Sequence, residues 1–350
     1  MIIAHLDLDA FFAAVEELED PSLKTKPLVV GGDPQGRGVV ATANYEARRF
    51  GIHSAMSCAE ALRRCPHATF IRPRHSLYRE YSQHVWETVR GVVPTVERTG
   101  VDEGYLDVGE VAADFLQARR VAEAVQTAVH ATTSLTCSLG VSTSKVVAKI
   151  ASDHRKPGGL TVVPAGSEAR FLAPFDVRRL PGIGPKAEQR LVPAGIQTIG
   201  ALADLPDNEL RRLLPGSVGR VLRDRARGTD PRGLELQAER ISISVENTFE
   251  RDLTDRDQLH TELRRMAERV AVHLRDTGRT ARTVSTKLRY TDFSIRSRST
   301  SLRIGIDDPQ EIGDLACANL DRALADRAGA LRLVGVGVSG LASHRQLALL

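Results

Sequence analysis

Cysteine is scarce in this chain of 350 residues, and long apolar runs are missing. The four cysteines, Cys58, Cys65, Cys137 and Cys317, form no C-x-x-C pair and no Cys/His cluster with zinc-ligand spacing. This pattern argues against a disulfide framework and favours reduced thiols in a cytosolic protein. No apolar run approaches the ~18 residues of a membrane-spanning helix, and the start carries acids where a signal peptide carries basic residues. We therefore expect a cytoplasmic protein with no membrane contact.

A strong excess of either charge is also missing. The net charge is +4 and the isoelectric point is near 9.0, so a nucleic-acid partner is permitted but not required. Hydrophobic residues make up 42% of the chain, which is ordinary for a globular protein, and the length allows two or more cores.

Two acidic segments stand where solvated carboxylates are unexpected. Asp7-Leu8-Asp9 follows a run rich in β-formers, and strand alternation places Asp7 and Asp9 on the same face as His5. Asp102 and Glu103 lie in a second such run, Val101 to Val108. If both strands belong to one sheet, Asp7, Asp102 and Glu103 converge, and divalent metal ions would offset their repulsion. A solvated edge strand and a simple turn remain the alternatives for each segment alone.

These acids belong to a longer ordered pattern. It runs through residues 7–16, 26–32, 37–52, 101–107, 137–142, 145–152 and 156–160. Together these blocks resemble the Y-family translesion DNA polymerases, particularly the bacterial DNA polymerase IV type. The resemblance is dense over the first two thirds of the chain, and several ordered blocks at compatible spacing are far more specific than any one alone.

The resemblance implies an α+β multidomain fold shaped as a right-hand polymerase. The expected parts are a catalytic palm (residues 1–10 and 76–166), fingers (11–75), a thumb with a helix-hairpin-helix element (167–230), a linker (231–240), a βαββαβ little finger (241–342) and a C-terminal tail (343–350). Strands at Thr99 to Val108, Leu135 to Val141 and Leu160 to Val163 alternate with helices in the palm, which predicts one mixed sheet.

Glycines mark the turns of the predicted thumb. Leu180-Pro181-Gly182-Ile183-Gly184-Pro185-Lys186 precedes a helical stretch and then Gly195-Ile196, the pattern of a helix-hairpin-helix, although a plain turn between helices would look similar. By the resemblance, Gly182, Gly184 and Lys186 contact DNA.

The last hundred residues predict a βαββαβ domain by periodicity alone. Residues 275–303 hold eight basic and two acidic side chains, and alternation on the predicted strands singles out Lys287, Arg289, Arg296 and Arg298. We expect these four to track DNA phosphates on one basic face, with a merely solvated face as the alternative.

The resemblance assigns chemistry to individual residues. Asp7, Asp102 and Glu103 are the expected catalytic residues, and with the Leu8 carbonyl they are the expected ligands of two Mg²⁺ ions, which Mn²⁺ can replace. Asp9 and Asp107 are expected to be structural. The expected nucleotide-binding residues are Phe11, Phe12, Thr42, Tyr45, Arg48 and Lys156. Among these, Phe12 matches the steric gate that excludes ribonucleotides, which leaves Phe11 available for packing. The alternative is that both rings are simply part of the core. An ion pair between Arg48 and Glu46 is the alternative to a triphosphate contact.

Two positions depart from the family pattern. Gly100 stands where a serine is usual and Ser57 where a proline is common, which puts primer-end positioning and lesion preference in doubt. The C-terminal residues Gln346, Leu347, Leu349 and Leu350 resemble a bacterial peptide that binds the sliding clamp.

The expected function is template-directed, low-fidelity DNA synthesis from dNTPs on primer-template DNA, without proofreading, by a monomer that binds a sliding clamp. A catalytically dispensable scaffold in a mutagenesis complex is the main alternative. Another palm enzyme, such as a nucleotidyl cyclase, is disfavoured because it has no duplex to hold.

Overall fold

The acidic strand predicted at the start of the chain is central in a five-stranded sheet. In the computed structural model, which describes residues 1–236 and 239–343, the sheet order is β5-β6-β1-β7-β8. The strands are β5 (Val96–Arg98), β6 (Glu103–Asp107), β1 (Ile3–Leu8), β7 (Cys137–Ser142) and β8 (Leu160–Val162). β1 pairs antiparallel with both neighbours, whereas β7 and β8 are parallel, so the sheet is mixed as predicted.

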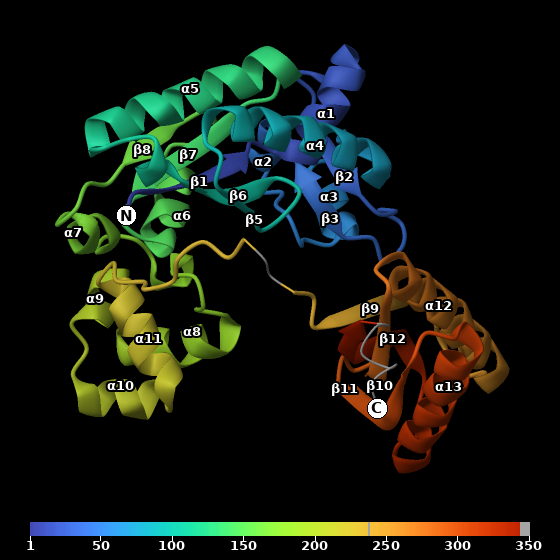
Figure 1. Ribbon diagram of the computed structural model, residues 1–350. Coiled ribbons are helices and arrows are strands. Elements are labelled where there is room, and N and C mark those ends of the chain that lie inside the picture. The colour runs from blue at the N-terminus through green and yellow to red at the C-terminus, as the bar shows by residue number, and fades with distance from the viewer. Residues whose placement is uncertain (237–238, 344–350) are drawn as a thin grey trace. The chain divides into compact units, whose positions relative to one another are not determined.

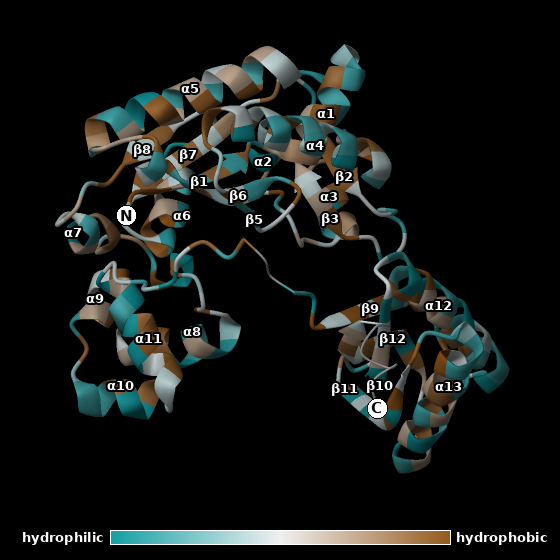
Figure 2. Ribbon diagram, in the orientation of Figure 1, coloured by the Kyte–Doolittle hydropathy of each residue, from teal (hydrophilic) through white to brown (hydrophobic). Residues whose placement is uncertain are grey.

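Helices cover both faces of this sheet, which we call the palm sheet. α4 (His75–Val92) and α5 (Phe115–Thr133) lie over one face, and α6 (Lys145–His154) lies over the other (Figure 1). Hydrophobic and hydrophilic segments alternate along α5, as expected for a helix with one buried side (Figure 2).

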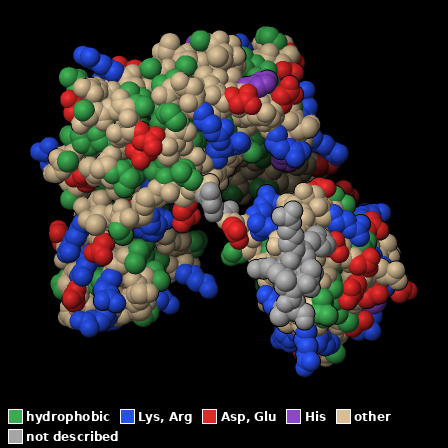
Figure 3. Space-filling model, in the orientation of Figure 1, with side chains coloured by type: hydrophobic (Ala, Val, Ile, Leu, Met, Phe, Trp, Pro, Cys, Tyr) green, Lys and Arg blue, Asp and Glu red, His purple; other side chains and the backbone are tan. Residues whose placement is uncertain are grey.

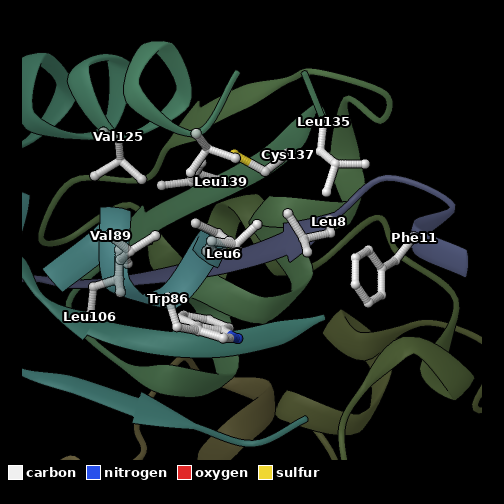
Figure 4. Close-up of a cluster of buried hydrophobic side chains, with 14 of the residues drawn as sticks. Leu6, Leu8, Phe11, Trp86, Val89, Leu106, Val125, Leu135, Cys137 and Leu139 are labelled. Carbon is white, nitrogen blue, oxygen red and sulfur yellow. The ribbon is translucent and has the colours of Figure 1, made fainter. Parts of the chain in front are cut away.

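The face beneath α4 and α5 forms the core. Strand alternation directs Leu6, Leu8, Leu106 and Leu139 into it, where they meet Trp86 and other apolar side chains of the helices (Figure 4). All of these side chains are at most 2% exposed. Because apolar residues occupy this face, His5, Asp7 and Glu103 point to the opposite face, where α6 packs.

A second, three-stranded sheet lies between α1 (Phe11–Glu19) and α4 in the sequence. Its order is β3 (Val40–Ala43), β2 (Leu28–Gly31), β4 (Thr69–Ile71), and α2 (Tyr45–Arg48) and α3 (Cys58–Arg64) accompany it. Ser57, one of the departures from the family pattern, caps α3 because its side chain accepts a hydrogen bond from the Glu60 N–H at 3.1 Å.

Five short helices follow the palm sheet and share one core. They are α7 (Glu168–Leu172), α8 (Pro185–Leu191), α9 (Ile199–Ala203), α10 (Asp207–Leu213) and α11 (Ser217–Ala226). Their leucines pack with Val146, Val147 and Ile150 of α6, so this helical region is built onto the palm sheet through that helix.

The chain divides into two compact units. The first comprises Met1–Pro34 and Gly38–Leu236, and the second comprises Gln35–Arg37 and the chain from Gln237 onward. The second unit contains the predicted βαββαβ order: β9 (Ser242–Leu253), α12 (Arg256–Asp276), β10 (Arg279–Tyr290), β11 (Ile295–Ile306), α13 (Pro309–Asp326) and β12 (Leu331–Ser343). Its sheet order is β11-β10-β12-β9. In the described ranges, no helix is both long and apolar enough to cross a membrane.

Candidate active site

The three predicted catalytic acids meet at one end of the palm sheet. Asp7 on β1 is the register partner of Glu103 on β6, so the two side chains share a face. Asp102 lies one residue before β6, and its carbonyl accepts a hydrogen bond from the Leu8 N–H at 2.9 Å. The predicted continuous strand from Thr99 to Val108 is wrong, because the N–H groups of Thr99 and Gly100 turn back to the Glu103 carbonyl in a tight turn.

Two lysines pair with acids of this cluster. The Lys156 ammonium lies 2.6 Å from Asp7 Oδ1 and 2.7 Å from Asp153 Oδ1, and the Lys149 ammonium lies 2.5 Å from Glu103 Oε2. Lys156 was predicted as a nucleotide contact and does lie beside the acids. Lys149 was missed, although its place in the predicted helix packed on the strand of Asp7 was the available signal.

His5 is a second neighbour of Glu103 that the sequence did not identify as part of the site. Its buried ring bonds through Nδ1 to the Ser152 hydroxyl at 2.8 Å, and its Nε2 lies 3.6 Å from Glu103 Oε2. Burial lowers the pKa of His5, which favours the neutral ring.

The acids differ in proton affinity because their surroundings differ. Burial raises the pKa of Asp7 to about 6 even with Lys156 beside it, and burial also raises the pKa of Asp102. Interactions with the nearby His5 ring and the Lys149 ammonium lower the pKa of Glu103 to about 2 in spite of burial. Two carboxylates in this cluster therefore lack full charge compensation.

The donor chemistry fits a divalent metal ion. Across the described ranges, no three His, Cys, Asp or Glu side chains are grouped as ready ligands, and Lys156 and Lys149 contact Asp7 and Glu103 here. Carboxylate oxygens are nevertheless the ligands that Mg²⁺ prefers. The raised pKa values of Asp7 and Asp102 indicate that further positive charge would stabilise their ionised forms.

Two of the predicted triphosphate ligands lie together on α2. The Arg48 guanidinium is 5.0 Å from the Tyr45 ring centroid, and Arg48 Nε donates to the Ala43 carbonyl at 2.9 Å. Glu46 pairs with Arg49, so the proposed alternative of a Glu46 to Arg48 pair is wrong. Thr42, at the end of β3, is half-buried just before this helix.

Asp9 connects α2 to the loop that carries Lys156. Its carboxylate, 4% exposed, accepts hydrogen bonds from the Ser138 hydroxyl and the Gly158 N–H, both at 2.8 Å, and from the Tyr45 hydroxyl at 3.4 Å. These contacts support the interpretation of Asp9 as a structural residue. A cavity of about 370 Å³ opens beside Asp9 and Tyr45.

The two adjacent phenylalanines have different environments. Phe11 is 2% exposed in the palm core, so its ring cannot touch a nucleotide, and its prediction as a nucleotide-binding side chain is corrected to packing (Figure 4). Phe12 is half-buried and stacks on Tyr78 with a centroid distance of 4.2 Å and an interplanar angle of 14°. Tyr78 in turn donates to Glu16 at 2.5 Å, so the ring beneath Phe12 is itself fixed.

The predicted hairpin of the thumb is present with a shorter first element. A single 3₁₀ turn, Val177–Arg179, precedes the glycine segment, and α8 follows it. Gly182 has a φ of +106°, which favours glycine, and Gly184 caps α8. Lys186 is exposed on the first turn of α8. Lys and Arg side chains gather over the neighbouring α10 and α11 (Figure 3).

The four predicted basic residues of the C-terminal sheet do not share a face. Leu288 pairs with Arg296 and Thr286 pairs with Arg298, so both arginines point to the side of the buried Leu288 and Thr286. Arg298 accordingly forms an ion pair with Asp326 of α13. The single basic face is therefore wrong, because the register offsets the odd-numbered cations of β10 from the even-numbered cations of β11.

Of these four residues, only Lys287 and Arg289 lie on the face away from the helices, which we call the open face. Lys287 pairs with Glu246 of β9 at 2.9 Å. The direct register partners of Lys287 are the small residues Gly335 and Ser297, whereas Arg289 pairs with Leu333 and Ile295. The predicted tail residues Gln346, Leu347, Leu349 and Leu350 lie outside the described residues.

Comparison with known proteins agrees with this geometry. Residues 6–153 match the impB/mucB/samB family, and residues 240–349 match the C-terminal domain of that family. Residues 165–196 match the IMS family HHH motif. The chain is 44% identical to a DNA polymerase IV of Streptomyces coelicolor over 98% of this chain and 72% of that one. It is 42% identical to a DNA polymerase IV of Dehalococcoides mccartyi over 96% and 86%.

Solved structures are similar over nearly the whole chain. A Y-family DNA polymerase chimera of Dbh and Dpo4 has a TM-score of 0.89 at 26% identity and covers 98% of this chain and 100% of that one. An insertion ternary complex of Dbh DNA polymerase has a TM-score of 0.68 at 26% identity, with the same two coverages.

A palm sheet with three converging acids, a helix-hairpin-helix region and a βαββαβ domain are the parts expected of a right-hand DNA polymerase. The chain belongs to the Y family of DNA polymerases, in the branch of bacterial DNA polymerase IV. It is therefore a DNA-directed DNA polymerase of translesion synthesis that binds DNA and nucleotides, and it requires a divalent metal.

Proposed function

We propose that Asp7, Asp102, Glu103 and the Leu8 carbonyl hold two Mg²⁺ ions, which Mn²⁺ can replace. The observation that carries this proposal is the register pairing of Asp7 with Glu103, with Asp102 beside them. Bound metal would supply charge stabilisation for nucleotidyl transfer to the primer 3′-hydroxyl. Lys149 and His5 orient Glu103, and the low pKa of Glu103 keeps it ionised.

The incoming triphosphate is bound by Thr42, Tyr45, Arg48 and Lys156. A guanidinium, an ammonium and hydroxyl groups match the phosphate oxygens in charge and hydrogen-bonding capacity. Arg48 lies over Tyr45, and Asp9 ties Tyr45 to the Lys156 loop, so the four groups come from one connected region. On nucleotide binding, the Lys156 ammonium exchanges its contact with Asp7 for a phosphate oxygen.

Sugar selection is assigned to Phe12. Its ring is held against Tyr78, which leaves no freedom to yield to a ribose 2′-hydroxyl. Fixed aromatic packing of this kind converts a small steric difference into discrimination.

The remaining parts have DNA-holding and partner roles. Gly182, Gly184 and Lys186 bring backbone amides and one cation to a phosphate, and Lys287 and Arg289 bring two cations to phosphates on the open face. The domain boundaries predicted above apply, with palm, fingers, thumb, linker and little finger. Residues 346–350 bind a sliding clamp, and the enzyme works as a cytoplasmic monomer.

Substitution of Asp102 tests the metal assignment. Asp102→Ala should abolish primer extension with Mg²⁺ or Mn²⁺ and leave primer-template binding nearly unchanged, because it removes charge stabilisation and not a backbone contact. Extension within tenfold of the parent would reject the assignment, whereas the scaffold alternative predicts no extension even by the parent protein.

A further inference from the structure

The edge strand of the palm sheet carries a buried ion pair that catalysis does not use. The Glu97 carboxylate of β5 pairs with the Lys145 ammonium at the start of α6, and their side chains are 11% and 5% exposed. The Lys145 ammonium also lies 5.0 Å from the Tyr105 ring centroid. Burying two charges costs desolvation free energy, so a contribution to stability alone does not explain this ion pair.

The same carboxylate binds the chain that leaves the thumb. Glu97 Oε2 accepts a hydrogen bond from the Glu235 N–H at 2.7 Å. We call residues 228–236 the linker segment, and one further contact joins it to the palm while another orders it internally. The Ser144 hydroxyl, next to Lys145, donates to the Gly228 carbonyl at 2.9 Å, and the buried Asp230 carboxylate is gripped by Arg232 at 2.8 and 2.6 Å.

Glu97 is also connected to the catalytic acids through neighbouring side chains. Glu97 pairs with Tyr105, and Tyr105 pairs with His5, so the three side chains form one row across the face that carries the acids. The His5 and Tyr105 ring centroids are 4.8 Å apart, and His5 contacts Glu103. The linker segment is therefore fastened to the sheet that carries the active site.

We propose that Glu97 and Lys145 are positioning residues that fasten the linker segment to the palm sheet and thereby strengthen the hold of the C-terminal unit on primer-template DNA. Lys145 fixes the Glu97 carboxylate, and Glu97 fixes the linker backbone at Glu235. The effect on DNA rests on the proposed DNA contacts of Lys287 and Arg289.

The size of the effect follows from chain length. With the segment fastened, the stretch that joins the two units is residues 237–241, and without it the stretch is residues 229–241. Effective concentration falls with roughly the −3/2 power of tether length, so release should lower it about fourfold. DNA affinity should weaken by about the same factor.

A double substitution removes the anchor without leaving a buried charge alone. Glu97→Leu/Lys145→Met replaces the pair with apolar side chains of similar size, which folded proteins generally tolerate. In the full-length protein we expect faster amide hydrogen exchange in residues 229–236, about fourfold weaker binding of a fluorescent primer-template, and an unchanged single-turnover insertion rate at saturating DNA. Unchanged exchange in a folded double variant would overturn the anchor.

A second variant approaches the contact from the linker side. Glu235→Pro removes the N–H that donates to Glu97. Leu236→Pro is its matched control, because it places the same φ-restricting ring one residue further and keeps that N–H. Glu235→Pro should weaken DNA binding like the double variant, and Leu236→Pro should not. Faster exchange with unchanged DNA affinity in both test variants would reject the coupling to DNA. If Lys287→Ala/Arg289→Ala also left DNA binding unchanged, the proposed role of the open face would fail separately.

Discussion

Ionisation of Asp7 costs free energy, because its position on a central strand removes the carboxylate from most of its water. Its side chain is 19% exposed, and one lysine shared with Asp153 does not offset the loss of water. The pKa of Asp7 is therefore raised to about 6, while the pKa of Glu103, with His5 and Lys149 beside it, is lowered to about 2. Two acids of one cluster thus have opposite effects on stability as the pH changes.

The direction of the pKa shift of Asp7 leads to a prediction about stability. A carboxyl with a raised native pKa stabilises the fold when protonated, and this contribution is lost as pH rises from the ordinary value of 3.8 through about 6. Without divalent metal, Asp7→Asn should therefore be more stable than the parent at pH 8, by roughly 1–3 kcal/mol, and should lose the advantage below pH 4. Denaturant unfolding at both pH values measures this, and equal stability at pH 8 would contradict it.

The stacked pair Phe12 and Tyr78 gives a prediction about substrate choice. Phe12→Ala should raise incorporation of ribonucleotides relative to deoxynucleotides by up to roughly a hundredfold, because the ring that blocks the 2′-hydroxyl is gone. Ratios of kcat/KM for matched nucleotide pairs measure the change. Phe11→Ala is the control, and it should cost about 3–5 kcal/mol of stability with little change in selectivity.

At the scale of elements, periodicity predicted most of the fold. The α6 boundaries and the βαββαβ order came from the sequence, because amphipathic periods and turn residues act locally. The register between β10 and β11 could not be predicted from the sequence. It depends on the whole hairpin, and a shift of one residue moves every side chain of a strand to the opposite face of the sheet. The same limit explains why Thr99 to Val108 looked like one strand, and why the sequence did not indicate the roles of Lys149 and Glu97.

The corrected register changes the expected DNA contacts. Lys287→Ala/Arg289→Ala should weaken primer-template binding regardless of sequence and flatten the salt dependence by roughly 0.9 in log-log slope for each phosphate that is no longer neutralised. Arg296→Ala/Arg298→Ala removes the same charge from the helix side of the sheet, so it should leave the slope unchanged and should mainly affect stability. Binding titrations at several salt concentrations would distinguish the pairs, and equal slopes for all proteins would show that the open face does not hold DNA.

At the scale of the whole molecule, two compact units must act on one primer-template. The order of motifs along the sequence predicted the palm and the C-terminal domain, because each builds its own core from its own part of the chain. The anchoring of the linker segment could not be predicted. The anchoring depends on the carboxylate of Glu97, which lies on an edge strand 138 residues before Glu235. No local sequence pattern predicts a contact between residues so far apart.

The tail prediction concerns how long the enzyme stays at a primer end. A clamp-binding peptide at residues 346–350 would raise the local concentration of a weakly held polymerase without changing the chemical step. Deletion of these residues should leave extension of a short primer-template unaltered in the absence of a clamp and should abolish stimulation by the cognate clamp. Product lengths on a primed circular template, with and without loaded clamp, measure both effects. A control that replaces only Ala348 with serine keeps the apolar anchors Leu347, Leu349 and Leu350 and should retain stimulation. If the clamp stimulates the truncated enzyme as strongly as the full chain, the clamp must bind another surface of the molecule.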